Sequence, residues 1–235
     1  MKNPNSHGTL AAVGCALFLI AAYAGLKILL SSPGARILFG AWADAPWMIT
    51  GNSIVILAVM SGLMAVCLRL TGQTWADLGL KASLSRREAA WGAVAGLAVY
   101  GSITAFHSFE HASARQPEAA LSALIFSPSR SWFHALFSIS LLTGVLEELV
   151  YRGAIVGFLR RGFGGGAVAA GLAAFVSGLV FSVMHPLTGL NAYILYAGIG
   201  AGLSLVYMHT GSLGTVILAH VLANGIAVVC GLIAN

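Results

Sequence analysis

The sequence predicts an all-α fold: a polytopic transmembrane helix bundle of about seven to eight spans with a buried polar site. Of its 235 residues, 58% are hydrophobic and 8% are charged, whereas soluble domains carry roughly 25% charged residues. Long apolar runs recur along the chain, and a membrane-spanning helix needs about 20 apolar residues. No long polar linker divides the chain, so residues 1–235 are expected to form a single integral membrane domain.

The predicted spans follow one another at short intervals, at residues 10–30, 48–68, 89–106, 132–159, 166–184, 192–207 and 215–233. The first run exceeds the core of about 7–15 residues of a signal peptide, so we interpret it as a retained helix. An eighth crossing requires residues 117–127 to re-enter the membrane. Three glycines at 164–166 predict a break before the fifth span. The Gly92-x-x-x-Gly96 and Gly198-x-x-x-Gly202 patterns favour close helix packing.

Basic residues predict the orientation of the bundle. The N-terminal tail, the 69–87 loop and the turn after the fourth span carry most of the Lys and Arg, and they share one side if there are seven spans. Positively charged loops stay inside, so we expect the N-terminus inside and the C-terminus outside, although Arg36, Arg115 and Arg130 lie on the opposite side. The short loops and Ala- and Gly-rich composition favour a bacterial inner (plasma) membrane.

The expected partner of most of the surface is the lipid bilayer. The net charge of +5 comes from basic residues scattered between apolar runs. A nucleic-acid-binding protein would gather them in a patch or stripe. The sequence therefore argues against a nucleic acid partner.

The fourth span carries charges that lipid disfavours. Glu147, Glu148 and Arg152 lie in an otherwise apolar run, and each intramembrane charge costs about 2.5–3.5 kcal/mol on insertion scales. Four residues apart on a helix, Glu148 and Arg152 face each other and can form an ion pair. Glu147 lies about 100° around the helix from Glu148. A structural ion pair would explain Glu148 and Arg152 but not Glu147, which favours Glu147 as a general base or acid.

Two later spans carry further polar faces. Phe181 and His185 are four apart at the end of the fifth span, just before Pro186. An imidazole there could be an ordinary interfacial histidine, or could orient water, shuttle a proton or bind metal. His220 and Asn224 share one face of the last span, where they could stabilise an oxyanion or form interhelical hydrogen bonds. Three polar faces in one small bundle favour a common site.

The depths of these residues do not match at first sight. At 1.5 Å per residue, Glu147, His185 and His220 would lie about 20, 28 and 14 Å from the inner ends of their spans. The three side chains can meet only if the spans are tilted, are broken or begin at different heights.

The three motifs, in this order, resemble the CPBP family, the CAAX proteases and bacteriocin-processing enzymes of the membrane. The family pattern is Glu-Glu-x-x-x-Arg, then Phe-x-x-x-His, then His-x-x-x-Asn, and no motif position departs from it. Residues 77–80 and 210–213 also look like the family, so the resemblance defines a CPBP-like protease core over residues 74–235. Three ordered motifs on apolar helices are a specific signal, while the first two spans are merely compatible with it.

The resemblance implies a glutamic-type intramembrane endopeptidase that acts on a membrane-bound protein or peptide substrate and needs no cofactor. By analogy, Glu147 activates water and His185 helps to hold that water. His220 and Asn224 would form the oxyanion hole. The remaining motif residues would orient the site or pack beside it, namely Glu148, Arg152 and Phe181.

Two alternatives stay open at this point. One is a zinc-dependent intramembrane metalloprotease with Glu147, His185 and His220 as ligands, since a His₂Glu set binds zinc, although a His-Glu-x-x-His motif is absent. The other is a non-catalytic membrane protein, either an immunity factor or a transporter with a proton-relay carboxylate. The sequence does not distinguish a prenylated CAAX protein, a peptide precursor and a sorting-signal protein as substrates.

Overall fold

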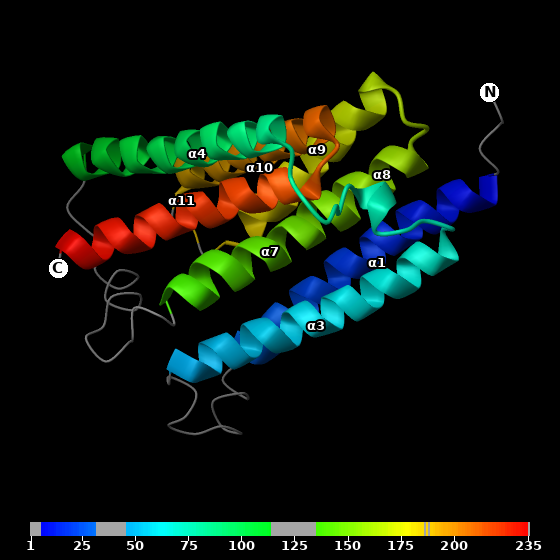
Figure 1. Cartoon of the computed structure of the whole chain (residues 1–235), viewed down its shortest axis with the longest axis horizontal. Coiled ribbons are helices and arrows are strands. Elements are labelled where there is room, and N and C mark those ends of the chain that lie inside the picture. The colour runs from blue at the N-terminus through cyan, green and yellow to red at the C-terminus, as the bar shows by residue number, and fades with distance from the viewer. Residues whose placement is uncertain (1–5, 32–45, 114–134, 186, 188, 235) are drawn as a thin grey trace.

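A computed structural model describes residues 6–31, 46–113, 135–185, 187 and 189–234, and within these ranges the chain is helical with no strand. Long helices lie side by side in an elongated bundle (Figure 1). In chain order they are α1 (Ser6–Ser31), α3 (Pro46–Leu70), the short η2 (Ala76–Leu78), α4 (Arg86–Ser113), η3 (Ala135–Leu142), α7 (Thr143–Glu148), η4 (Leu149–Val156), α8 (Gly157–Gly162), α9 (Ala167–Val183), α10 (Leu190–Thr210) and α11 (Leu213–Ala234). The predicted all-α bundle is confirmed.

Within the described ranges the helices follow the order of the predicted spans. Five are long and apolar enough to cross a membrane, at Gly8–Leu30, Thr50–Leu70, Arg86–Phe109, Leu190–Thr210 and Leu213–Cys230. The consecutive segments η3, α7, η4 and α8 cover the fourth predicted span, and α9 is an apolar helix of 17 residues. The 117–127 stretch proposed as a possible eighth crossing lies outside the described residues. The chain is therefore an integral membrane protein.

The predicted glycine break separates α8 from α9. Helix α8 ends at Gly162, and α9 begins at Ala167. Between them Gly164 and Gly165 have φ angles of 87° and 76°, a left-handed conformation that glycine adopts at little cost. The chain thus reverses within a few residues, and α9 packs closely along α10.

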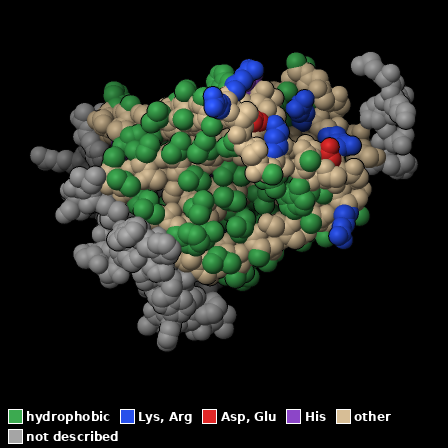
Figure 2. All heavy atoms as spheres, in the orientation of Figure 1, with side chains coloured by type: hydrophobic (Ala, Val, Ile, Leu, Met, Phe, Trp, Pro, Cys, Tyr) green, Lys and Arg blue, Asp and Glu red, His purple; other side chains and the backbone are tan. Residues whose placement is uncertain are grey.

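Described basic residues gather at one end of the bundle (Figure 2). Helix α1 begins at one end and α11 ends at the other (Figure 1), as an odd number of crossings requires. Lys and Arg side chains gather toward the end at which α3 ends and α4 begins (Figure 2). The basic residues predicted for the other side, Arg36, Arg115 and Arg130, lie outside the described residues.

The loop between α3 and α4 closes the basic end of the bundle. Asp77 accepts hydrogen bonds from the Thr74 hydroxyl and N–H at 2.8 and 2.7 Å, which lowers the pKa of the Asp77 carboxyl. Leu78 follows on η2 and is 1% exposed. Its carbonyl accepts a hydrogen bond from the Tyr207 hydroxyl at 3.0 Å, which ties the loop to the end of α10.

Two segments that resemble the CPBP family outside the three motifs meet at this loop. Gly79, in 77–80, accepts a hydrogen bond at its carbonyl from the N–H of Leu213, in 210–213, at 3.0 Å. Gly79 has a φ of 72°, and a Cβ there would collide with the Gly211 carbonyl oxygen. The contact brings backbone against backbone and requires glycine at position 79.

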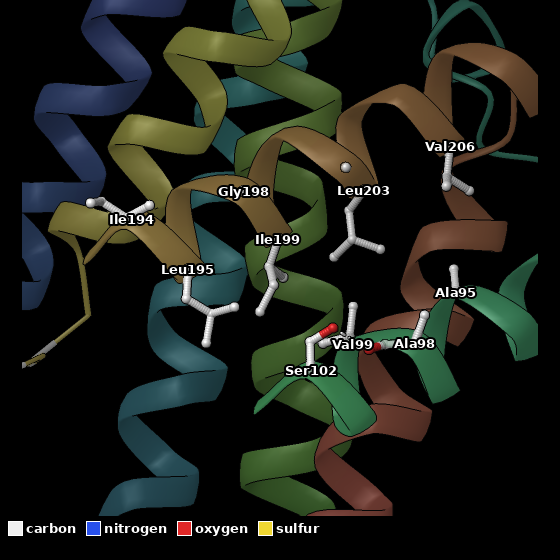
Figure 3. A pocket seen from close by; sticks show the side chains of 11 residues that line it. Ala95, Ala98, Val99, Ser102, Ile194, Leu195, Gly198, Ile199, Leu203 and Val206 are labelled. Carbon is white, nitrogen blue, oxygen red and sulfur yellow. Dashed lines mark hydrogen bonds between the residues drawn. The ribbon is translucent and has the colours of Figure 1, made fainter. Parts of the chain in front are cut away.

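The predicted close-packing glycines behave differently from one another. A Cβ on Gly92 or Gly96 would collide with a backbone carbonyl of α11, so this pair brings α4 and α11 together as expected. Gly198 and Gly202 have no other atom near their Cβ positions, so their predicted close packing is wrong. They line an open apolar groove of about 390 Å³ between α4 and α10 (Figure 3). Close contact of α10 with α9 depends instead on Gly178 and Gly200.

Replacement of Gly79 by Ala should destabilise the protein more than replacement of Gly72. Both glycines have left-handed backbones, but Gly72, with a φ of 63°, has open space around its Cβ position. A left-handed Ala costs about 1–2 kcal/mol, and the collision at Gly79 should add about 1–3 kcal/mol. Thermal unfolding of the purified variants in detergent measures the difference, and equal Tm values for Gly79→Ala and Gly72→Ala would contradict it.

Candidate active site

The paired glutamates lie at the centre of the bundle on α7, between two segments that depart from α-helical geometry. At the end of η4 the Gly157 N–H donates to the Arg152 carbonyl, five residues back. Such π-type widening is rare in helices and frequently accompanies functional sites. The side chains of Glu147, Glu148 and Arg152 are 3%, 0% and 0% exposed, so every charge here depends on partners within the protein.

Glu148 and Arg152 form the expected ion pair. Arg152 Nη1 donates to Glu148 Oε1 at 2.7 Å. The other terminal nitrogen, Nη2, donates to the carbonyl of Gly200 on α10 at 2.9 Å. The arginine therefore links η4 to α10 as well as neutralising its glutamate. Gly200 lets α10 approach α9 closely, and its carbonyl thereby lies within reach of Arg152.

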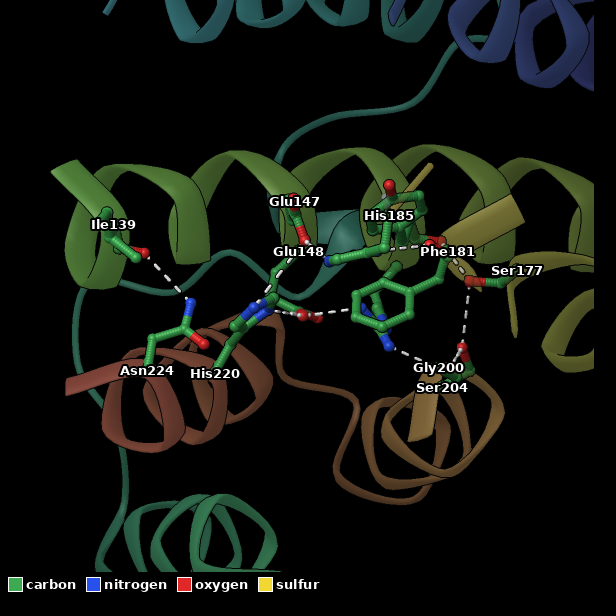
Figure 4. A network of polar contacts seen from close by, with 12 residues as sticks. Ile139, Glu147, Glu148, Ser177, Phe181, His185, Gly200, Ser204, His220 and Asn224 are labelled. Carbon is green, nitrogen blue, oxygen red and sulfur yellow. Dashed lines mark hydrogen bonds and ion pairs between the residues drawn. The ribbon is translucent and has the colours of Figure 1, made fainter. Parts of the chain in front are cut away.

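His220 shares the same carboxylate. Its Nδ1 lies 2.7 Å from Glu148 Oε1, so one oxygen accepts hydrogen bonds from both Arg152 and His220 (Figure 4). An ionised carboxylate only accepts, which puts the His220 proton on Nδ1. The neutral imidazole then presents the lone pair of Nε2 to the rest of the site.

His185 is held in the same way by a backbone carbonyl. It follows the end of α9, and its Nδ1 lies 2.6 Å from the carbonyl oxygen of Phe181. Because a carbonyl only accepts, Nδ1 carries the proton and Nε2 carries the lone pair. The bond also satisfies one of the carbonyls left open at a helix C-terminus.

Phe181 is the apolar centre of the site. Its ring lies 4.4 Å from the His185 ring and 6.1 Å from the His220 ring, measured between centroids. The Arg152 guanidinium lies 5.3 Å from the centroid of the same ring. Phe181 thus packs against both imidazoles, as the sequence predicts for a residue beside the site.

The remaining acid, Glu147, faces both imidazoles. Its Oε2 lies 3.6 Å from His185 Nε2 and 3.9 Å from His220 Nε2, beyond direct hydrogen-bond distance. The same oxygen is buried without a hydrogen-bond partner among the described residues. Three acceptor atoms on three different elements therefore converge on one point. Helices that begin at different heights bring these three side chains together despite their unequal predicted depths.

Asn224 lies one turn beyond His220 on α11 but is anchored elsewhere. Its Nδ2 donates to the Ile139 carbonyl on η3 at 3.1 Å (Figure 4). A side-chain amide has two N–H donors, so one remains for a substrate atom. This anchor is an interhelical hydrogen bond of the kind that the sequence left as the alternative to an oxyanion donor.

Helix α1 contributes two residues to the site that the sequence motifs did not indicate. Lys27 Nζ lies 4.0 Å from Glu147 Oε1, whereas the imidazoles approach the other carboxylate oxygen, Oε2. Tyr23, one turn earlier, interacts through its hydroxyl with Glu147 and packs its ring edge-to-face on Tyr151, at 5.9 Å between centroids. A lysine inside an apolar span is itself an anomaly, so the reasoning applied to the glutamates could have found Lys27.

Within the described ranges, no group of three or more His, Cys, Asp or Glu side chains is placed to hold a metal ion. The three acceptor atoms around Glu147 are nevertheless of the types that zinc binds.

Comparisons with known proteins agree with the site. A family model described as "Type II CAAX prenyl endopeptidase Rce1-like" matches residues 129–226, which contain all three motifs. The chain is 34% identical over 95 residues to the membrane-embedded CAAX protease MroQ of Staphylococcus aureus (strain USA300). That match covers 40% of this chain and 38% of the relative, so the chain matches well under half of the relative's length. No solved structure matches the chain.

The fold and the site define an integral membrane protein with two buried carboxylates and two imidazoles at its centre. Over less than half of the chain, the ordered motifs and both sequence matches make it similar to CAAX-type membrane proteases.

Loss of Arg152 alone should be more harmful than loss of the whole ion pair. Arg152→Met leaves the Glu148 carboxylate buried without its cation, which costs about 3–5 kcal/mol. Glu148→Gln combined with Arg152→Met removes both charges and should recover much of that stability. Chemical or thermal unfolding of the single and double variants measures the effect. A double variant that is less stable than Arg152→Met would contradict this account of the pair.

Proposed function

We propose that this protein is an intramembrane endopeptidase in which Glu147 activates water to hydrolyse a peptide bond of a membrane-associated protein or peptide. The observation that carries the proposal is the convergence of Glu147 Oε2, His185 Nε2 and His220 Nε2 at a buried point. Two of these atoms, Glu147 Oε2 and His185 Nε2, suit a water molecule, which has two protons to donate. The similarity to CAAX-type membrane proteases supports the reaction class.

The proposed reaction begins with a water bound between Glu147 and His185. One water proton passes to the Glu147 carboxylate, the hydroxide oxygen bonds to the peptide carbonyl carbon, and the carbonyl oxygen becomes an oxyanion. The protonated Glu147 then gives its proton to the departing nitrogen as the C–N bond breaks and the C=O bond re-forms. General acid–base catalysis of this kind contributes about 10²–10⁴-fold in rate.

His220 and Asn224 are proposed to stabilise the oxyanion. The second N–H of the Asn224 amide is available beside the one that binds Ile139. In the neutral form His220 Nε2 is an acceptor, because the proton lies on Nδ1 and is shared with Glu148. For the oxyanion role we propose that His220 first takes up a second proton from solvent on Nε2 and acts as an imidazolium. Glu148 stabilises that cation through its hydrogen bond to Nδ1, and Arg152 holds Glu148 in place. One well-placed oxyanion donor is worth about 10²–10³-fold in kcat.

The proposed location is a bacterial inner membrane with the N-terminus inside and the C-terminus outside. The gathering of Lys and Arg at one end of the bundle supports this orientation through the preference of basic loops for the inner side. Substrates are proposed to be membrane-bound proteins or peptides, and the partner surface is lipid rather than nucleic acid.

Glu147→Gln should abolish cleavage while leaving the fold intact. The amide keeps the size of the side chain but cannot take a proton from water, so kcat should fall by about 10²–10⁴-fold. Purified protein in liposomes is incubated with membrane-anchored peptides, with and without a prenyl group, and new termini are identified by mass spectrometry.

Glu88→Gln is the matched control for the loss of one carboxylate, because Glu88 pairs with Lys81 in the loop before α4 and lies outside the site. It should cleave as the unmodified protein does. Equal cleavage by Glu147→Gln would end the catalytic assignment and favour a non-catalytic membrane protein. Substrates retained by the inactive variant would identify the natural sequence that is cut.

We further propose that hydrolysis requires no metal, with zinc held by Glu147, His185 and His220 as the alternative. Purified protein should contain far less than one zinc per chain, and a strong chelator should leave kcat unchanged. Elemental analysis and activity after dialysis against chelator test this. Stoichiometric zinc whose removal stops turnover, and whose return restores it, would establish the metalloprotease instead.

A further inference from the structure

Lys27 differs from the chain's other two lysines in its position. It lies within the first span, while the chain's other lysines, Lys2 and Lys81, lie in the N-terminal tail and in the loop before α4. Its ammonium group reaches the end of α9, where Nζ donates to the Met184 carbonyl at 3.1 Å. Helix α1 lies outside residues 129–226, so the family match says nothing about it.

The end of α9 needs such a donor. The helix stops inside the bundle, and the last carbonyls of any helix lack partners within it. His185 satisfies the Phe181 carbonyl with its own side chain, and Lys27 satisfies that of Met184, the residue just before His185. A cation is also favoured at a helix C-terminus by the alignment of peptide dipoles. Lys27 therefore binds the backbone that carries a proposed catalytic imidazole.

The same ammonium group balances the charge of Glu147. The four charged side chains of the site form two sets: Glu148 with Arg152 at 2.7 Å, and Glu147 with Lys27 at 4.0 Å. The longer separation gives attraction without a direct hydrogen bond, so the Glu147 carboxylate stays free to act as a base. The Lys27 side chain is 34% exposed, which places it at the edge of the site.

We propose that Lys27 is a positioning residue of the active site that fixes the α9 end, and with it His185, against an ionised Glu147. The proposal rests on the function proposed above. It assigns to the first helix, through one side chain, a direct part in the geometry of a site otherwise built from α7, η4, α9 and α11.

Lys27→Met tests the proposal, with Lys27→Arg as the conservative variant and Lys81→Met as the matched control for the loss of one lysine. Cleavage by the unmodified protein and its loss in Glu147→Gln first establish the enzyme. In Lys27→Met, kcat should then fall about 10- to 100-fold with KM changed less than about threefold, as for a misplacement of catalytic groups. Lys27→Arg should recover most of the rate, and Lys81→Met should retain it.

The pH profile separates positioning from general loss of packing. The groups that interact with Glu147 are Lys27 and Tyr23 from α1, Tyr151 and Arg152 from η4, His185 after α9, and His220 from α11. Removal of one positive charge among them makes protonation of Glu147 easier. The acidic limb of the kcat/KM profile should therefore move to higher pH in Lys27→Met and return toward its original place in Lys27→Arg.

Hydrogen exchange gives a readout that does not depend on catalysis. In the Glu147→Gln background, Lys27→Met should speed exchange at the amides of Met184, His185 and Leu187, while Lys81→Met should not. Unchanged exchange, an unchanged kcat and pH profile, or a loss of rate that Lys27→Arg does not restore would each overturn the proposal. Failure of the unmodified protein to cleave any substrate would instead count against the proposed function.

Discussion

The structure depends on the pairing of one buried oxygen atom, Oε1 of Glu148. A carboxylate with no exposed surface must find its partners inside the protein, because an isolated charge in a low-dielectric interior is strongly disfavoured. Glu148 takes a guanidinium from the next helical turn and an imidazole from α11, and that guanidinium binds the α10 backbone through its other terminal nitrogen. One acid thereby fixes the relative positions of three parts of the bundle.

The pairing of Glu148 also helps to orient the imidazoles that face Glu147. Because Glu148 holds the proton of His220 on Nδ1 and the Phe181 carbonyl holds that of His185 on Nδ1, both imidazoles turn their Nε2 lone pairs toward Glu147. Glu147 is left close to both rings without a hydrogen bond at Oε2. The two acids thus differ in their pairing: Glu148 Oε1 accepts from both a guanidinium and an imidazole, whereas Glu147 Oε2 lies between two imidazoles without a hydrogen bond. Glu148 Oε2 is likewise buried without a partner among the described residues.

The architecture around the acids explains how helices of different length reach one point. Helix α9 is short and ends inside the bundle, where side chains rather than further helical turns satisfy its terminal carbonyls. Gly178 and Gly200 let α9 and α10 approach closely enough for Arg152 to bind the α10 backbone. Helix α1 completes the surroundings of Glu147 with Lys27 and Tyr23.

The sequence by itself determined the helical membrane fold, the order of the spans, the break at 164–166 and the pairing of Glu148 with Arg152. Each of these features depends on composition or on spacing along a single helix. Both properties can be read directly from the sequence. Only the tertiary structure decided that His220 shares Glu148, that Asn224 binds Ile139, that Gly198 and Gly202 line a groove, and that Lys27 reaches Glu147. Those contacts depend on where each helix begins and how closely it packs on its neighbours, and helical periodicity fixes neither.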